Sequence, residues 1–221
     1  MDSILRQIHT DLHVSMNGVV SDSLREKGMH YRLNYGVTIP KLRQIAQKYT
    51  PCQTLAETLW AEDVRESKIL ATMLYPTADF TKETAEKWVH KIPYQEIREQ
   101  VCRNLFQELP FADTLVQKWA ENEIVDIRIT GYWLFARLCI AHAKKTEKIE
   151  TKPIIEKAVN DLKANSMLLR QSALNVLKYF GRLSKAQGAT ILHNISAYEH
   201  SGQSQERETF DILRFEFEHS Q

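Results

Sequence analysis

Residues that make tight turns are scarce in this sequence. Its 221 residues include 7 glycines and 6 prolines. Each is about 3% of the chain, against typical shares of about 7% and 5%. Because tight turns depend on these residues, turns must be few, which argues against a sandwich or barrel of short strands. Neither glycine-rich phosphate loop, G-x-G-x-x-G or G-x-x-x-x-G-K-[ST], is present, so the common nucleotide-binding loops are excluded. A mostly helical chain remains.

Long apolar runs and paired cysteines are missing as well. The longest apolar stretch, residues 132–143, is interrupted by Arg137 and is too short to cross a bilayer. Cys52, Cys102 and Cys139 are odd in number and far apart, which predicts reduced thiols packed in a core rather than a disulfide framework. The first residues lack the basic and apolar segments of a signal peptide. We therefore expect a cytoplasmic protein without a membrane partner.

The charges are unevenly distributed, although the net charge at pH 7 is only +1. Residues 61–127 carry a net charge of −5 and residues 191–221 a net charge of −4. Residues 128–190, in contrast, hold 12 basic and 4 acidic side chains, a net charge of +8. Such a block can be the footprint of a phosphate-bearing partner. It can equally be the solvated surface of ordinary helices.

Four segments of the chain resemble one another: residues 54–74, 83–106, 113–138 and 154–180. Each begins with a short amphipathic helix, and after a polar turn a more apolar helix starts at an apolar residue followed by arginine. These arginines are Arg65, Arg98, Arg128 and Arg170. A helix pair that cannot bury its apolar face alone buries it by stacking on the next pair. The sequence therefore predicts an all-α fold, an α-α superhelix of HEAT-like repeats, with residues 1–221 as a single domain.

Further helices are expected before and after these repeats, over residues 2–16, 19–27, 40–49, 184–198 and 203–218. A loop at residues 34–38 should separate the second and third of them. The last helix is polar and acidic, which suits a cap that faces solvent at the end of a solenoid.

Candidate functional residues lie near the starts of the second helices, because a solenoid carries its function on the concave surface that these helices line. They are Tyr94, Arg98, Glu99, Arg128, Tyr132, Arg170, Asn175 and Lys178. The repeated arginine has two interpretations, since its planar fork matches both a carboxylate of the next repeat and a DNA phosphate. His9 and His13 lie one helical turn apart but lack a third ligand, so we expect no metal site.

Residues 35–46 read Tyr-Gly-Val-Thr-Ile-Pro-Lys-Leu-Arg-Gln-Ile-Ala. This stretch resembles the N-terminal signature of the bacterial DNA alkylation repair enzymes, the AlkD-like proteins built from HEAT-like repeats. Leu59-Trp60 and Arg65-Glu66 fit the next repeat of the same family, and the repeat layout is similar over roughly residues 5–200. The resemblance implies a C-shaped solenoid that holds duplex DNA on a basic concave face.

The resemblance also implies a reaction. Active members of the family release cationic alkylated purines as free bases, without a metal or cofactor and without flipping the base into a pocket. Their active surface uses two tryptophans and an aspartate. The aromatic faces attract the cationic base, and the carboxylate stabilises the positive charge that develops on the sugar as the glycosidic bond breaks.

This sequence departs from the family pattern at two of those three positions. Tyr94 keeps an aromatic ring at the first, but Arg98 occupies the aspartate position and Asn175 the position of the second tryptophan. A cation opposes the developing positive charge, because like charges about 4 Å apart repel by roughly 4 kcal/mol at an effective dielectric constant near 20. Glu99 is the next carboxylate along the helix, about 100° further round its axis.

Basic residues persist where the family contacts phosphate, since Arg128 matches a family arginine and Lys178 replaces another. Three hypotheses follow. The first is a divergent member that binds duplex DNA without excision, through Arg98, Arg128, Arg170, Asn175 and Lys178. The second is an active alkylpurine DNA glycosylase with a rearranged site formed by Tyr94 and Glu99. The third is a HEAT-repeat scaffold whose partner is a protein or an RNA.

Overall fold

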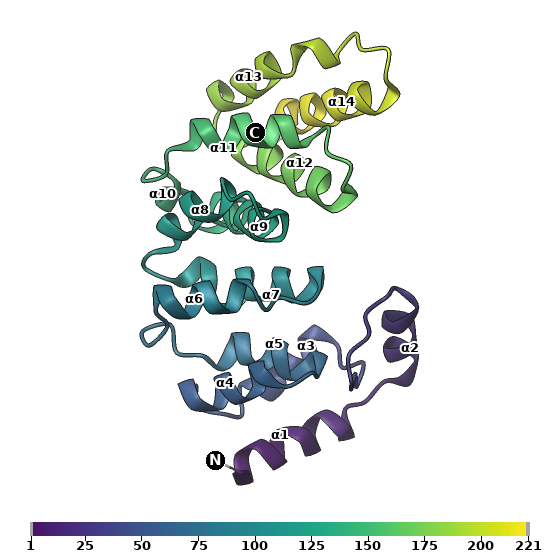
Figure 1. The fold of residues 1–221 in the computed structure, drawn as a ribbon, viewed down its shortest axis with the longest axis vertical. Helices are drawn as coiled ribbons and strands as arrows, with labels where there is room; N and C mark the ends of the chain where they lie inside the picture. The colour runs from purple at the N-terminus through teal and green to yellow at the C-terminus, as the bar shows by residue number, and fades with distance from the viewer. Residues whose placement is uncertain (1, 220–221) are drawn as a thin grey trace. The chain divides into compact units, whose positions relative to one another are not determined.

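The structure, a computed structural model, describes residues 2–219 and contains 14 α-helices and two short 3₁₀-helices in that range (Figure 1). They form two compact units, an N-terminal unit that ends at Leu109 and a C-terminal unit that begins at Pro110. No helix of the described range is long and apolar enough to span a membrane. The single domain expected from the repeats stays a prediction.

The N-terminal unit consists of helix pairs and one long non-helical segment. Its helices are α1 (Asp2–Val14), α2 (Gly18–Glu26), α3 (Ile39–Ala46), α4 (Gln53–Ala61), α5 (Arg65–Leu74), α6 (Lys82–Val89), α7 (Gln95–Asn104) and η1 (Phe106–Glu108). The pairs α4/α5 and α6/α7 are the first two repeats predicted from the sequence. Helix α5 packs against α3, α4 and α7, and Figure 1 shows α4 and α6 to the left of α5 and α7.

The first helices of these two repeats are joined by tryptophan packing. Trp60 of α4 and Trp88 of α6 are buried, and their rings are parallel with centroids 4.0 Å apart. Tyr75 and Phe80 meet the edge of the Trp88 ring at 5.6 and 5.2 Å. Offset or perpendicular aromatic contacts of this kind stabilise beyond the area they bury, so this cluster ties α4 to α6.

The segment between α2 and α3 is not helical and packs against the start of α5. Leu33 forms an isolated parallel bridge with Val64, and the carbonyl of Leu33 accepts a hydrogen bond from the backbone N–H of Arg65 at 3.3 Å. Gly36 has a φ of +67°, and a Cβ atom there would lie 2.1 Å from the carbonyl oxygen of Asn17. Only glycine fits a positive φ in so close a contact, which explains the glycine of the Tyr-Gly-Val run.

The C-terminal unit continues the helix pairs. Its helices are α8 (Ala112–Ala120), α9 (Val125–Ala141), α10 (Ala143–Thr146), α11 (Thr151–Asp161), α12 (Met167–Gly181), α13 (Lys185–Asn194), η2 (Ser196–Tyr198) and α14 (Ser204–Glu218). Helix α9 packs on α8 and α12, and α12 in turn contacts α11, α13 and α14. Helices α8 and α9 approach closely at Gly131, where a Cβ atom would lie 2.3 Å from the backbone nitrogen of Ala120.

The structure confirms the predicted all-α class and the four helix–turn–helix repeats, whose turns fall where the polar residues and the apolar-Arg pairs predict them. Cys102 and Cys139 are buried free thiols, as expected. The expectation of burial is wrong for Cys52, which is half-exposed. It is the N-cap residue of α4 and therefore lies outside the apolar stripe of that helix.

Candidate functional site

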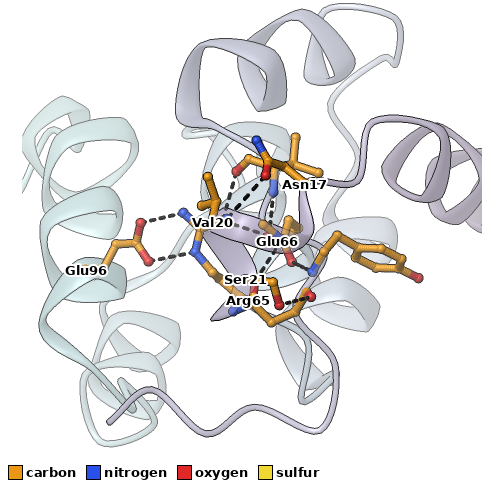
Figure 2. A network of polar contacts seen from close by, with 10 residues as sticks. Asn17, Val20, Ser21, Arg65, Glu66 and Glu96 are labelled. Carbon is orange, nitrogen blue, oxygen red and sulfur yellow. Dashed lines mark hydrogen bonds and ion pairs between the residues drawn. The ribbon is translucent and has the colours of Figure 1, made fainter. Parts of the chain in front are cut away.

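The arginine that opens α5 is the centre of a buried ion-pair network (Figure 2). The Nε and Nη2 atoms of Arg65 donate to the two carboxylate oxygens of Glu96 on α7, at 2.8 and 2.6 Å. Its Nη1 atom donates to Glu66 at 2.7 Å and to the carbonyl of Val37 at 2.9 Å. The two-pronged contact with Glu96 is the geometry that makes arginine–carboxylate pairs strong. Arg65 thus links consecutive repeats.

Glu66 holds the segment that carries the family-like signature. Its carboxylate is fully buried and accepts the backbone N–H groups of Tyr35 and Val37, each at 3.1 Å. The Ser21 hydroxyl donates to the carbonyl of Asn34 at 2.8 Å and fixes the other side of the same loop. The Arg-Glu pair and the Tyr-Gly-Val run therefore form one structural unit, with each satisfying the buried polar groups of the other.

Tyr94 is engaged by the non-helical segment before α3. Its hydroxyl accepts the backbone N–H of His30 at 3.0 Å and donates to the carbonyl of the same residue at 3.2 Å. Its ring meets that of Tyr31 edge-on, with centroids 4.9 Å apart. Burial, followed by the charge of nearby Glu96, raises the pKa of Tyr31, so the Tyr31 phenol is neutral at pH 7. The hydroxyl of Tyr94 is therefore committed to backbone hydrogen bonds.

The other two candidates on α7 are buried or half-buried rather than exposed to a ligand. Arg98, which the resemblance puts at an aspartate position, is 3% exposed, and its Nη1 atom donates to the amide oxygen of Gln95 at 2.6 Å. Glu99 is half-buried and accepts a hydrogen bond from the Gln95 amide at 3.2 Å. Burial raises the pKa of Glu99. The placement of Arg98 favours a structural role over phosphate contact.

Arg128 repeats the arrangement of Arg65 in the C-terminal unit. Its Nε atom lies 2.9 Å from Asp161 of α11, and its Nη1 atom donates to the carbonyl of Asn122 at 2.8 Å. The hydroxyl of Tyr132, another sequence candidate, donates to the same carboxylate at 2.8 Å. Burial and this hydrogen bond raise the pKa of Tyr132. The arginine is 7% exposed. This geometry too favours a structural role over DNA contact, since Arg65 and Arg128 each pair with a carboxylate of the next repeat. We call this series of ion pairs the ladder.

The candidates on α12 are more accessible. Arg170 is half-buried and donates to the carbonyls of Ala164 and Asn165 at 2.6 and 3.0 Å, closing the turn that precedes α12. Asn175 and Lys178 are half-exposed on the same helix. Lys178 forms an ion pair with Glu216 of α14. About a quarter of the Lys178 side chain stays exposed, so solvent and ligands can still reach it.

Sequence reasoning missed Glu96 as the acidic partner of Arg65. A signal was present, since Glu96 follows Arg65 by 31 residues and Asp161 follows Arg128 by 33, close to one repeat length. Searching for a carboxylate one repeat after each arginine would have found both pairs. Among residues 2–219, no group of three or more His, Cys, Asp and Glu side chains is arranged to hold a metal ion.

The profile of the family described as DNA alkylation repair enzyme matches residues 25–186. The chain belongs to this family. No curated protein matches it in sequence. The match covers the Tyr-Gly-Val signature, the Arg65–Glu66 pair and all four repeats, so the buried network described above lies within the part of the chain that the DNA alkylation repair family shares.

Two solved structures are similar to this DNA alkylation repair family member. One is described as a new family of proteins related to the HEAT-like repeat DNA glycosylases with affinity for branched DNA structures. It has a TM-score of 0.75 and 13% sequence identity, covering 95% of this chain and 94% of that chain. The other is a designed armadillo repeat protein with a TM-score of 0.45 and 11% identity, covering 96% and 98%. The first likeness confirms the HEAT-like fold predicted from the repeats.

Proposed function

We propose that this member of the DNA alkylation repair family binds DNA and does not excise bases. The observation that carries the proposal is the state of Arg98. It stands where the family resemblance implies a catalytic carboxylate, and its guanidinium is buried and hydrogen-bonded to Gln95. Excision needs an anion beside the sugar as positive charge develops there, and a fixed cation has the opposite effect.

The remaining candidates do not replace that anion. Glu99 is the nearest carboxylate along α7, but its hydrogen bond comes from Gln95 and burial raises its pKa, so its charged form is disfavoured. The hydroxyl of Tyr94 is occupied by the backbone of His30. An active glycosylase with a rearranged site would require both residues to be released from these contacts.

DNA binding is supported by family membership and by the charge of α12. The related protein of similar fold is described as having affinity for branched DNA structures. On this chain we place the contact at Asn175 and Lys178, with Arg182 one turn further along α12, because their side chains are partly exposed. Arg128 keeps its role in the ladder, and Arg170 its role in the turn before α12.

The test is a fluorescence-anisotropy titration of a short duplex and a four-way junction at two salt concentrations. Each phosphate neutralised by a lysine or arginine contributes about −0.9 to the slope of log K against log salt. We expect measurable affinity at low salt and a steep dependence of log K on log salt. In Lys178→Gln the slope should be shallower by about 0.9, the contribution of one phosphate contact. Lys152→Gln is the matched control, because Lys152 lies in the same basic block and is 84% exposed.

The same samples are then incubated with alkylated duplex and assayed for free 7-methylguanine. No release is expected. Release above the level of a no-protein control would refute the non-excising assignment and direct mutagenesis to Tyr94 and Glu99. Absence of binding to either DNA at low salt would refute DNA binding and leave a protein or RNA partner.

A further inference from the structure

A pocket of about 630 Å³ opens on the side of the N-terminal unit formed by α4 and α6. It lies between the first helices of two successive repeats, and Lys68 of α5 also lines it. Lys87 and Lys91 line it from α6 and from the turn after α6. Its residues belong to the N-terminal unit, whereas the residues proposed to contact DNA belong to the C-terminal unit.

Three ammonium groups line this pocket. In the part of the chain that the structure describes, no ion pair is recorded for Lys68, Lys87 or Lys91. Burial lowers the pKa of Lys68, while the negative charges of Asp63 and Glu62 oppose this effect and the positive charge of Lys91 adds to it. The positive charges of these lysines stabilise an anion that enters between them.

The one carboxylate that lines the pocket is already engaged. Glu57 accepts a hydrogen bond from the hydroxyl of Tyr75 at 3.1 Å and another from the amide of Gln53 at 3.0 Å. Its carboxylate is therefore already bonded to two donors. With three lysines and one carboxylate, the lining carries a net charge of +2.

Several contacts hold the side chains of the pocket wall in place. Lys68 is held by a hydrogen bond from its Nζ atom to the carbonyl of Trp60 at 2.8 Å, and it lies 5.2 Å from the centre of the Trp60 ring. The parallel stack of Trp60 on Trp88 forms the base of the wall. Trp60 is 4% exposed, and its buried indole N–H has no hydrogen-bond acceptor. A preformed wall lowers the entropic cost of binding, because little has to be ordered.

We propose that this pocket is a binding site for a phosphate monoester, with Lys68, Lys87 and Lys91 as the groups that contact its oxygens. A monoester dianion matches the charge of the lining better than a singly charged phosphodiester does. Lysine is a point-charge donor suited to phosphate oxygens. The monoester can belong to a free phosphate compound or to the 5′-phosphate at a nucleic-acid end, and the experiment separates these two sources.

The experiment follows the indole N–H resonance of Trp60 in the full chain by NMR during titration with inorganic phosphate at constant ionic strength. We expect a saturable shift. The double variant Lys87→Gln/Lys91→Gln should weaken binding by about tenfold or more, since each lost lysine removes a charge-assisted hydrogen bond. The control Lys152→Gln/Lys185→Gln removes two exposed lysines elsewhere and should leave the curve unchanged. Because the four lysines are exposed, both double variants are expected to keep the wild-type melting temperature.

The second arm compares a single-stranded oligonucleotide carrying a 5′-phosphate with the same oligonucleotide carrying a 5′-hydroxyl. A saturable shift with the first only, lost in Lys87→Gln/Lys91→Gln, identifies the nucleic-acid end as the source. A shift with inorganic phosphate alone identifies a free phosphate compound. A non-saturating shift with every ligand, or equal loss in both double variants, overturns the site. Lys178→Gln should leave the phosphate titration unchanged, so failure of the DNA-binding proposal is distinguishable from failure of this one.

Discussion

The buried Glu66 carboxylate offers the sharpest test of the network that joins the first repeats. Glu66→Gln keeps the size of the side chain and removes its charge. One amide oxygen can still accept a backbone N–H, but the amide nitrogen then faces a donor, either a backbone N–H of the 35–37 segment or the Arg65 guanidinium. The substitution therefore leaves a buried cation with only Glu96 as its charged partner.

The cost follows from burial. Glu66 is 0% exposed, and the Arg65 side chain is 4% exposed. Removing one partner of a buried ion pair costs about 3–5 kcal/mol, and the retained contact with Glu96 places the expected loss near the lower end. Total stabilities are about 5–15 kcal/mol, so the loss is a large fraction. For a chain of this size it corresponds to a fall in melting temperature of roughly 6–20 °C.

The assay is urea unfolding followed by circular dichroism, with the slope of the transition compared between variants. Glu156→Gln is the matched control, because Glu156 is 60% exposed and meets Lys152 at 4.0 Å, so its loss should stay within about 0.5 kcal/mol. If Glu66→Gln lost less than about 1 kcal/mol, like a surface substitution, the interpretation of Arg65–Glu66–Glu96 as the structural link would be refuted.

Three further predictions concern packing and titration. Gly131→Ala forces α8 and α9 apart and should cost about 1–3 kcal/mol in thermal unfolding; Gly18→Ala, with nothing within 4 Å of its new Cβ, is the control and should not lower stability. Glu99→Gln should raise stability at pH 7, because burial raises the pKa of Glu99 and penalises its charged form; the gain should vanish at pH values below the unfolded pKa of glutamate, and a gain that persisted there would contradict this. Burial would raise the pKa of Asp11, but hydrogen bonds from a tyrosine hydroxyl and a lysine outweigh it and lower the pKa. Its stabilisation is therefore present above the unfolded pKa and is lost as the pH falls through the folded pKa. Asp11→Asn should thus cost about 0.2–1 kcal/mol at neutral pH and nothing in strong acid, and an equal cost at both would refute the ion-pair explanation.

The helices and repeats were predictable because their signals are local. The spacing of apolar residues decides which face of a helix is buried, and the polar turns fall between the two helices of each repeat. The buried tryptophans Trp60, Trp88 and Trp119 end first helices as the repeat pattern predicted. The 34–38 loop and its glycine were also visible in the sequence, although the contact of Gly36 with Asn17 was not.

The candidate site was only partly predictable, because the role of each arginine depends on whether a carboxylate about one repeat away pairs with it. The sequence offered two interpretations of Arg65, Arg98, Arg128 and Arg170, ladder or phosphate contact, and could not separate them. The structure shows Arg65 and Arg128 bonded to carboxylates 31 and 33 residues further along the chain. Long-range pairing of this kind is decided by how helices stack, and stacking is a property of the packed core rather than of local spacing.

The sequence by itself determined the helical class, the repeat layout and the family. Those features follow from periodicity, composition and residue identity, which act within one or two helical turns. Only the tertiary structure decided that Glu66 binds the 35–37 loop, that the Tyr94 hydroxyl meets the backbone of His30, and that three lysines converge between α4 and α6. Each of these contacts joins segments far apart in the chain, and burial supplies the free energy that brings them together.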